Sequence, residues 1–322
     1  MSNNIKGDIW LIGAGPMAVD YSKVLDALEV GYEVIGRGAQ SARSFEEATN
    51  HPVKVGGLEK CLSDATTRIP AMAIVAVGVN KLAETTMLLL ENGFKNILVE
   101  KPAGLDFQEI AKVAEESKRY YANVFVAYNR RFYGSVQKAQ QIIAEDGGVI
   151  SFNFEFTEWS HEIEPLKKAT GIKQNWFLAN STHVVDLAFY LGGRPIDISS
   201  YIAGGLSWHP LASIFSGSGV TEKGALFSYS ANWESAGRWS VEVLTRVHKL
   251  ILCPIEKLKI QKRGSLEVKH VDTIDYSFDE RFKPGIYIQC NNFISQNYGD
   301  LIHIEEHYRN SKVYHKIIDG QH

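Results

Sequence analysis

The chain is poor in the features that mark secreted, metal-binding or nucleic-acid-binding proteins. It has only 3 cysteines in 322 residues, at positions 61, 253 and 290, and none of them forms a Cys-x-x-Cys pair. A disulfide framework and a zinc knuckle are therefore not indicated, and we expect reduced thiols and no metal site. The formal net charge is only −3, which gives no electrostatic reason to expect nucleic acid or an anionic membrane as a partner.

Long hydrophobic runs are also lacking. The longest apolar run, Ala71 to Val79, is too short to span a bilayer and suits a buried strand. The opening MSNNIKGD, residues 1–8, is polar and has no apolar signal core behind a basic start. We therefore expect a cytoplasmic protein.

The chain is long enough for two domains, and its first part alternates between strand and helix patterns. Apolar strands are predicted at 9–12, 32–35, 53–55, 73–77, 97–100 and 123–127, with helices at 17–28, 41–49, 58–62, 83–91 and 107–119. Continuous apolar strands that alternate with helices indicate a parallel sheet covered on both faces. The sequence thus predicts an α/β fold that begins with a doubly wound Rossmann domain over residues 1–126.

The alternation stops after Ala127. Strands are predicted at 149–157, 197–203, 225–231, 239–246, 249–253 and 256–262, and helices at 136–144, 182–191, 285–296 and 303–317. Consecutive strands without helices between them are typical of antiparallel sheets that have one face covered and one face free. We predict an α+β domain over residues 127–322 with a large, mostly antiparallel open sheet, used for substrate binding and self-association.

A glycine fingerprint, Gly13-Ala14-Gly15-Pro16-Met17-Ala18, follows the first predicted strand. The first glycine permits a tight turn, the second lets a pyrophosphate approach the backbone, and Ala18 is small enough for the helix to pack on the strand. The N-terminus of the helix then offers unpaired N–H groups to phosphates. The pattern predicts that the first domain binds a dinucleotide.

The end of the second strand indicates which dinucleotide is bound. NAD-binding chains usually carry an acid there for the ribose hydroxyls, but this chain reads Ile35-Gly36-Arg37-Gly38, and Glu33 comes too early. Arg37, helped by Ser41 or Ser44, would suit a 2′-phosphate. The sequence therefore favours NADP over NAD, although a solvated arginine at a strand end is the alternative.

Taken together, these motifs resemble the glucose–fructose oxidoreductase / inositol dehydrogenase / MocA (Gfo/Idh/MocA) family over both domains. The resemblance is carried by the fingerprint, by Glu100-Lys101-Pro102 after the fifth strand, by Tyr128-Asn129-Arg130-Arg131, and by His183-Val184-Val185-Asp186. Within the family, "LVEKPAGL" and "YNRRFY" are most similar to members associated with surface-polysaccharide sugar biosynthesis.

The resemblance implies hydride transfer between a nicotinamide cofactor and a sugar or nucleotide-sugar carbon, by a homodimer or homotetramer. Hydride leaves a carbinol carbon only as its hydroxyl proton is taken, so the site needs a base and a cation. Lys101 would be the cation and His183 the acid/base group, and the peptide before Pro102 is often cis. The expected cofactor-binding residues are Gly13, Gly15, Pro16, Met17, Ala18, Arg37, Ser41, Val77, Glu100, Lys101 and Pro102.

The chain also departs from the family pattern. The family commonly has an aspartate four residues before this histidine, where this chain has Ala179. The usual Asn and His after the fourth strand correspond to Val79 and Leu82. The family's carboxylate–histidine pair therefore cannot be assumed for this chain, and His183 working with Lys101 alone is an alternative.

The remaining polar and aromatic residues near these motifs are substrate candidates. Asn129 and Arg130, with Arg131, could bind an anionic group such as a pyrophosphate, or could equally make salt bridges between the domains. Trp159 could stack on a sugar and His161 could donate a hydrogen bond to it. The candidates are Asn129, Arg130, Trp159, His161, Asn175, Trp176, Asn180 and Asp186.

Two other functions stay open on the sequence. One is a dinucleotide-binding regulatory protein without turnover, against which the joint presence of Lys101 and His183 counts. The other is a redox-assisted glycoside hydrolase or lyase that holds NAD tightly and oxidises and re-reduces its sugar.

Overall fold

The computed structural model describes residues 9–64, 66 and 68–320, so the polar stretch 1–8 lies outside the described residues. The chain forms two compact units. The first unit runs to Tyr128 and takes in Glu280–Tyr308, and the second comprises Asn129–Asp279 and Arg309–His322. The predicted boundary near residue 127 adjoins this division. The sequence assigned residues 280–308 to the second domain, whereas they group with the first unit.

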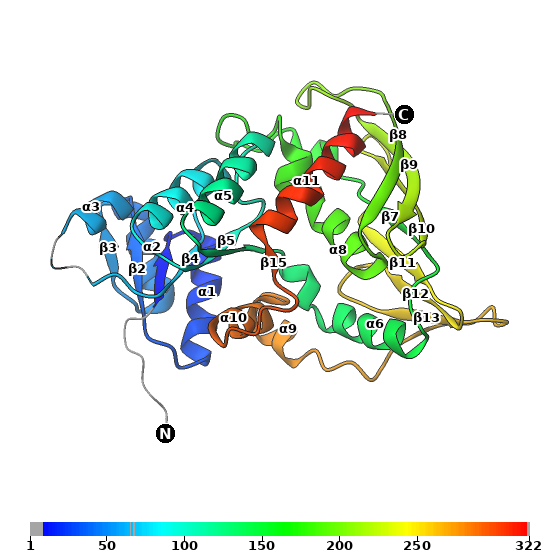
Figure 1. Ribbon diagram of the computed structural model, residues 1–322, viewed down its shortest axis with the longest axis horizontal. Helices are drawn as coiled ribbons and strands as arrows, with labels where there is room; N and C mark the ends of the chain where they lie inside the picture. The colour runs from blue at the N-terminus through cyan, green and yellow to red at the C-terminus, as the bar shows by residue number, and fades with distance from the viewer. Residues whose placement is uncertain (1–8, 65, 67, 321–322) are drawn as a thin grey trace. The chain divides into compact units, whose positions relative to one another are not determined.

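The first unit alternates strands and helices as predicted (Figure 1). Its elements are β1 (Ile9–Ile12), α1 (Pro16–Ala27), β2 (Tyr32–Gly36), α2 (Ala39–Thr49), β3 (Val53–Val55), α3 (Leu58–Ser63), β4 (Met72–Val75), α4 (Leu82–Glu91), β5 (Asn96–Glu100), α5 (Phe107–Arg119), β6 (Asn123–Ala127), α10 (Ile286–Ile294) and β15 (Ile302–His303). A short 3₁₀ turn, Val79–Lys81, precedes α4.

The strands of the first unit form one sheet in the order β15-β6-β5-β4-β1-β2-β3. All neighbouring strands are parallel except β15, which pairs antiparallel with β6. Every residue of β1 is buried, because helices pack against the sheet and leave no solvated face for alternating polar residues. From β1 the chain builds β2 and β3 on one side and β4 to β6 on the other. The carboxyl ends of β1 and β4 therefore flank the point where ligands bind in such sheets.

The second unit is dominated by an eight-stranded sheet. Its elements are α6 (Gly134–Glu145), β7 (Ser151–Glu155), α7 (Ser160–Ile163), α8 (Thr182–Gly192), β8 (Pro195–Ala203), β9 (Ile214–Thr221), β10 (Leu226–Asn232), β11 (Ser240–Leu244), β12 (His248–Leu252), β13 (Lys259–Lys262) and β14 (Val268–His270). A 3₁₀ turn, Asn129–Phe132, opens the unit, and a π-helical turn, Phe177–Ser181, leads into α8. Two helices, α9 (Ser277–Arg281) and α11 (Ile304–Asp319), cross the division between the units.

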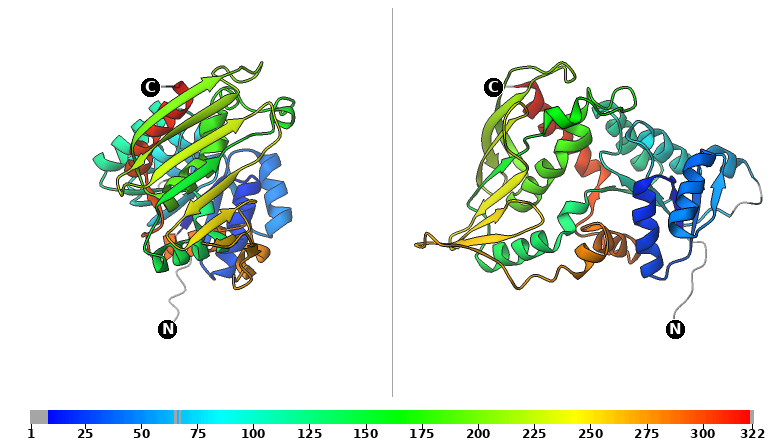
Figure 2. Two further views of the ribbon diagram at one scale, coloured as in Figure 1. Left: turned by 90° about the vertical axis from the view of Figure 1, so that its right-hand side faces the viewer. Right: turned by 180° about the vertical axis from the view of Figure 1, so that it is seen from behind.

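The strand order of this sheet is β14-β13-β12-β11-β7-β10-β9-β8. All neighbours are antiparallel except β7 and β10, which are parallel, so the predicted mostly antiparallel sheet is confirmed. Figure 2 shows the sheet in its left view with its open face toward the reader, and α8 packs on β7 and β11 from the other side. The covered face buries aromatic rings such as Phe152, Phe154 and Phe227.

The sequence did not predict β9. Its positions 217 and 219 are glycines, which the crowded surroundings require. A β-carbon at Gly217 would lie 2.3 Å from the Tyr229 hydroxyl oxygen, and one at Gly219 would lie 2.1 Å from the Asp197 carbonyl oxygen and 2.6 Å from the Phe227 ring. Glycine weakens the apolar alternation on which strand prediction depends. No helix in residues 9–64 or 68–320 is long and apolar enough to cross a membrane.

Candidate functional site

The glycine turn after β1 has the geometry of an anion-binding turn. Gly13 has a φ of +123°, and a β-carbon there would lie 2.3 Å from the carbonyl oxygen of Ala76. Only glycine fits this backbone and this approach to the end of β4. Helix α1 begins at Pro16, and no side chain caps it at Gly15. The first N–H groups of α1 are therefore left for an anion.

A cavity of about 390 Å³ opens at the carboxyl ends of β1 and β4. The predicted cofactor residues that line it are Gly13, Gly15, Arg37, Ser41 and Val77. Pro16, Met17 and Ala18 form the first turn of α1, where Ala18 is fully buried. Glu33 does not line this cavity, because its carboxylate accepts hydrogen bonds from the Trp10 indole at 3.1 Å and from Lys54 at 2.9 Å.

Charged residues that the sequence did not single out also lie here. Glu59, in the first turn of α3, lines the same cavity as Arg37. Lys81 and Glu84 line it too and form an ion pair at 2.6 Å.

Lys283 reaches the first turns of α1 from the distant segment 280–308, where its ammonium lies 2.6 Å from the sulfur of Met17 and 3.6 Å from a carboxylate oxygen of Asp20. Nothing in the local sequence around 283 indicates this approach.

Glu100 and Lys101 lie at the carboxyl end of β5, next to β4. Glu100 turns inward and accepts a hydrogen bond from the Tyr21 hydroxyl at 2.7 Å. Burial raises the pKa of the Glu100 carboxyl, and the charges of Lys101 and Lys283 oppose that rise. The Lys101–Pro102 peptide is cis, as the resemblance implied. The carbonyl oxygen of Pro102 lies 3.0 Å from Nε2 of the buried His307, which holds this loop from α11.

In the second unit, His183 lies in the first turn of α8, and its side chain is buried. The π-helical turn before it is a feature that often marks functional sites. Three residues further along the helix, Asp186 forms a buried ion pair with Arg131, at 2.8 Å from Nε and 2.6 Å from Nη2. This bidentate bond ties the 3₁₀ turn to α8 and uses the charge of both groups. Asp186, a substrate candidate from the sequence, therefore has both carboxylate oxygens bonded to Arg131.

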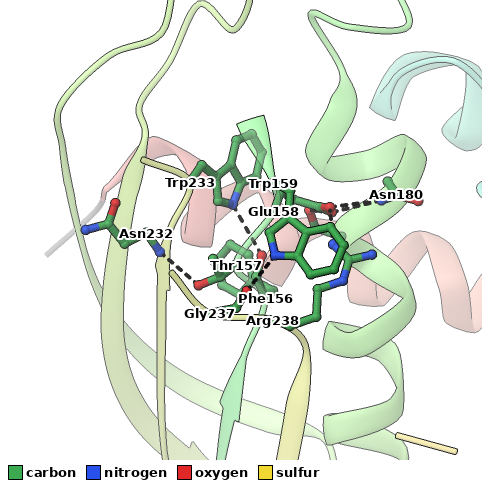
Figure 3. A network of polar contacts seen from close by, with 10 residues as sticks. Phe156, Thr157, Glu158, Trp159, Asn180, Asn232, Trp233, Gly237 and Arg238 are labelled. Atoms are coloured by element: carbon green, nitrogen blue, oxygen red, sulfur yellow. Dashed lines mark hydrogen bonds and ion pairs between the residues drawn. The ribbon is translucent and has the colours of Figure 1, made fainter. Parts of the chain in front are cut away.

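A buried carboxylate lies beside this turn, although the sequence analysis did not single it out. Glu158 follows β7, and Figure 3 shows that its side chain points toward Asn180 and Arg238. Its oxygens accept hydrogen bonds from Asn180 at 2.9 and 3.1 Å, from Ser181 at 2.8 Å and from Arg238 at 3.2 Å. Burial raises the pKa of the Glu158 carboxyl, although Ser181, Arg238 and Asn180 all favour the ionised form. The position occupied by Ala179 thus lacks an acid, but Glu158 brings one to the same turn from another strand.

Two tryptophan rings pack on Arg238, the arginine that is bonded to this carboxylate. Trp159 donates its indole N–H to the carbonyl oxygen of Gly237 at 2.9 Å (Figure 3). The Arg238 guanidinium lies 4.7 Å from the ring centre of Trp159 and 4.7 Å from that of Trp239. The ring of Trp239 is also 6.0 Å from that of His183 and 4.8 Å from the guanidinium of Arg130.

The other substrate candidates have varied surroundings. Asn129 is buried and hydrogen-bonds to Tyr133 through its side chain. Trp176 is buried and packs edge-on against Trp208, whereas Asn175 donates to the carbonyl oxygen of Gly171 at 3.0 Å. The side chain of His161 is 76% exposed, and its Nε2 lies 3.7 Å from a carboxylate oxygen of Glu162. The second unit therefore brings Arg130, Trp159, Asn180 and His183 into one cluster and leaves His161 outside it.

Comparisons with known proteins establish the fold. No model of a protein family matches the chain, and neither does any curated protein. Levoglucosan dehydrogenase, solved with NADH and L-sorbose, matches with 16% identity and a TM-score of 0.78, over 98% of this chain and 96% of that one. The WlbA dehydrogenase from Chromobacterium violaceum, solved with NADH and UDP-GlcNAcA, matches with 16% identity and a TM-score of 0.73, over 99% and 96% of the two chains.

UDP-N-acetylglucosamine 3-dehydrogenase GnnA from Acidithiobacillus ferrooxidans matches with 12% identity and a TM-score of 0.74, over 97% of each chain. At these identities the likeness concerns the fold, a Rossmann-like sheet followed by a mostly antiparallel one. All three solved structures are named as dehydrogenases, and two of them were solved with NADH.

Proposed function

We propose that the protein is an NAD(P)-dependent oxidoreductase, similar to the Gfo/Idh/MocA family, that moves hydride between a nicotinamide cofactor and a sugar or nucleotide-sugar carbon. The observation that carries the proposal is the Gly13 turn, where a strained glycine, an uncapped helix and a cavity occur at one strand end. The dehydrogenase neighbours, which include sugar and nucleotide-sugar enzymes, support it. A cytoplasmic setting and a role in polysaccharide biosynthesis remain predictions of the sequence.

The bound cofactor would supply the hydride acceptor or donor at its nicotinamide ring. The Gly13 turn and the first N–H groups of α1 would hold its phosphates. The ammonium of Lys101 would stabilise the alkoxide that forms at the reacting carbon, and a ring nitrogen of His183 would accept or return the hydroxyl proton. Glu100, held inward by Tyr21, would fix the start of the Lys101 loop.

The cofactor is proposed to be NADP. Arg37 and Ser41 line the cavity, and a guanidinium with a hydroxyl suits a 2′-phosphate. Glu59 opposes this preference, because a carboxylate in the same cavity repels a phosphate dianion. NAD is therefore the second candidate cofactor.

We also propose a homodimer or homotetramer that associates through the open face of the second sheet. Ser216, Ser218, Ser228 and Ser230 are exposed there on paired strands. Such short side chains leave room for a second sheet to approach closely.

The buried carboxyl of Glu158 supports a second candidate function, that of a redox-assisted glycoside hydrolase or lyase. A carboxyl whose pKa is raised by burial is the usual general acid of glycoside cleavage. That function predicts tightly held NAD and no net change in nicotinamide absorbance during turnover.

The Lys101→Met variant tests the proposed chemistry. Turnover of UDP-N-acetylglucosamine, UDP-GlcNAcA and levoglucosan would be followed by nicotinamide absorbance in the wild type and in the variant. We expect turnover of at least one substrate and a fall in kcat of at least about a hundredfold in Lys101→Met, since an essential proton-handling group is lost. Lys112→Met, which removes an exposed lysine of α5, is the matched control and should keep the wild-type rate. Equal rates in the two variants would rule out the role assigned to Lys101.

A further inference from the structure

Arg130 presents a guanidinium for which residues 9–64, 66 and 68–320 supply no acceptor. It is half-buried, with its guanidinium carbon 4.8 Å from the ring centre of Trp239 and 5.9 Å from that of Tyr133. These rings are its only direct partners among the described residues, none of which accepts a hydrogen bond from it or pairs with it. A guanidinium has five N–H donors, and a half-buried one without protein acceptors offers them to solvent or to a ligand. Burial lowers the pKa of Arg130.

The neighbouring arginine shows what a satisfied guanidinium looks like in this unit. Arg131 is buried and donates from two nitrogens to the carboxylate of Asp186. The salt bridge of Arg131 lies within the second unit, whereas the alternative that the sequence left open was a salt bridge between the domains. Arg130 keeps its charge available for a ligand.

A second guanidinium lies against the same indole ring. Arg238 is 4.7 Å from the Trp239 ring centre, its side chain is 44% exposed, and one of its nitrogens pairs with Glu158. The remaining donors of Arg238 have no described protein acceptor. Glu256 acts on Arg130 only electrostatically, without a hydrogen bond. Among the described residues around Trp239 there are therefore two guanidiniums, of which only Arg238 is bonded directly to a carboxylate.

We propose that Arg130 and Arg238, held against Trp239, form a binding site for an anionic group of the substrate, either a carboxylate or a phosphate. Both anions have oxygens spaced to accept two parallel N–H bonds from one guanidinium. The ring of His183 lies 6.0 Å from that of Trp239, so the anion would bind beside the proposed acid/base residue. The inference rests on the proposed function and narrows its substrate class to acidic sugars or sugar nucleotides.

The test measures binding of glucuronate, UDP and neutral glucose by calorimetry, without any dinucleotide. Glucuronate carries a carboxylate and UDP a diphosphate, so the two probes distinguish the source of the anion. We expect at least one of them to bind about tenfold or more tightly than glucose, as charge-assisted bidentate contacts allow. Arg130→Met should abolish that advantage and Arg130→Lys should keep part of it. Lys262→Met, which removes an exposed cation of β13, is the matched control and should bind like the wild type.

Two results would overturn the inference. One is that the wild type binds glucuronate and UDP no more tightly than glucose. This measurement uses the wild type alone, so it does not depend on how the Arg130 variants fold. The other is an anion affinity that falls equally in Arg130→Met and Lys262→Met. A parallel titration with NADPH and NADH separates the two proposals: dinucleotide binding without anion preference sinks only this inference, whereas failure to bind either dinucleotide sinks the proposed function.

Discussion

Glu158 is buried, and its carboxylate accepts hydrogen bonds from Asn180, Ser181 and Arg238. Ala179, four residues before His183, leaves that position of the chain without an acid. The structure brings in a carboxylate from the end of β7, which bonds Ser181 although 23 positions separate the two residues. Spacing along one helix could not reveal this contact, because it depends on how β7 and α8 pack. Because this carboxyl is buried only in the folded protein, its pKa differs between the folded and the unfolded chain.

Replacing Glu158 by Gln should stabilise the protein increasingly as the pH rises. Burial raises the pKa of this carboxyl above its ordinary value of 4.5, so the folded protein holds the proton more tightly than the unfolded chain does. Below the ordinary value both states are protonated and the group has no effect. As the pH rises from there through the raised folded pKa, the wild type loses stability because it must ionise a buried acid, and Gln cannot ionise.

The measurement is the free energy of unfolding in urea at about pH 4 and about pH 7, chosen to bracket the ordinary carboxyl pKa. The difference between Glu158→Gln and the wild type should become more positive at the higher pH. Glu162→Gln, at a side chain that is 71% exposed, controls for the change of formal charge and should show no such trend. A difference that shrinks as the pH rises would contradict the account of Glu158.

At the scale of elements, the glycine turn is the part of the site that the sequence predicted best. Its geometry is local, since one strand, one turn and one helix start follow each other within ten residues of the chain. The same holds for the Lys101 loop. Elements whose role depends on distant packing were missed. Examples are β9, where Gly217 and Gly219 make room for aromatic rings, and the segment that brings Lys283 to α1.

The two glycines of the turn should respond differently to alanine. Gly13→Ala requires a β-carbon 2.3 Å from the Ala76 carbonyl oxygen at a positive φ, so it should cost about 2 kcal/mol of stability. Gly15 has no atom within 4 Å of the β-carbon position and an ordinary φ of −93°, so Gly15→Ala should fold with nearly wild-type stability. Its methyl group would nevertheless stand where a pyrophosphate approaches, and NADPH or NADH affinity should fall about tenfold or more.

Thermal unfolding and nucleotide titration of both variants check this pair. Wild-type stability in Gly13→Ala would contradict the strained turn. Unchanged nucleotide affinity in Gly15→Ala would contradict the pyrophosphate site.

At the scale of the whole molecule, the sequence predicted both sheets. The alternation of strands with helices in the first part, and the run of consecutive strands in the second, are both visible in the pattern of apolar residues. The sequence assigned residues 280–308 to the second domain, whereas they group with the first unit. A helical pattern of apolar residues does not tell which sheet the helix will cover. The account of the whole protein depends on one claim, that the first unit binds a nicotinamide dinucleotide in the cavity beside Gly13.

Paired fluorescence titrations with NADPH and NADH test that claim most directly. The wild type should bind NADPH more tightly than NADH. Arg37→Ala should lose about tenfold in NADPH affinity but not in NADH affinity, because the guanidinium would attract the 2′-phosphate. Glu59→Gln should gain NADPH affinity, because the carboxylate would repel that phosphate. A preference for NADH that is indifferent to Arg37 would contradict the NADP assignment. Failure to bind either dinucleotide would contradict the account as a whole.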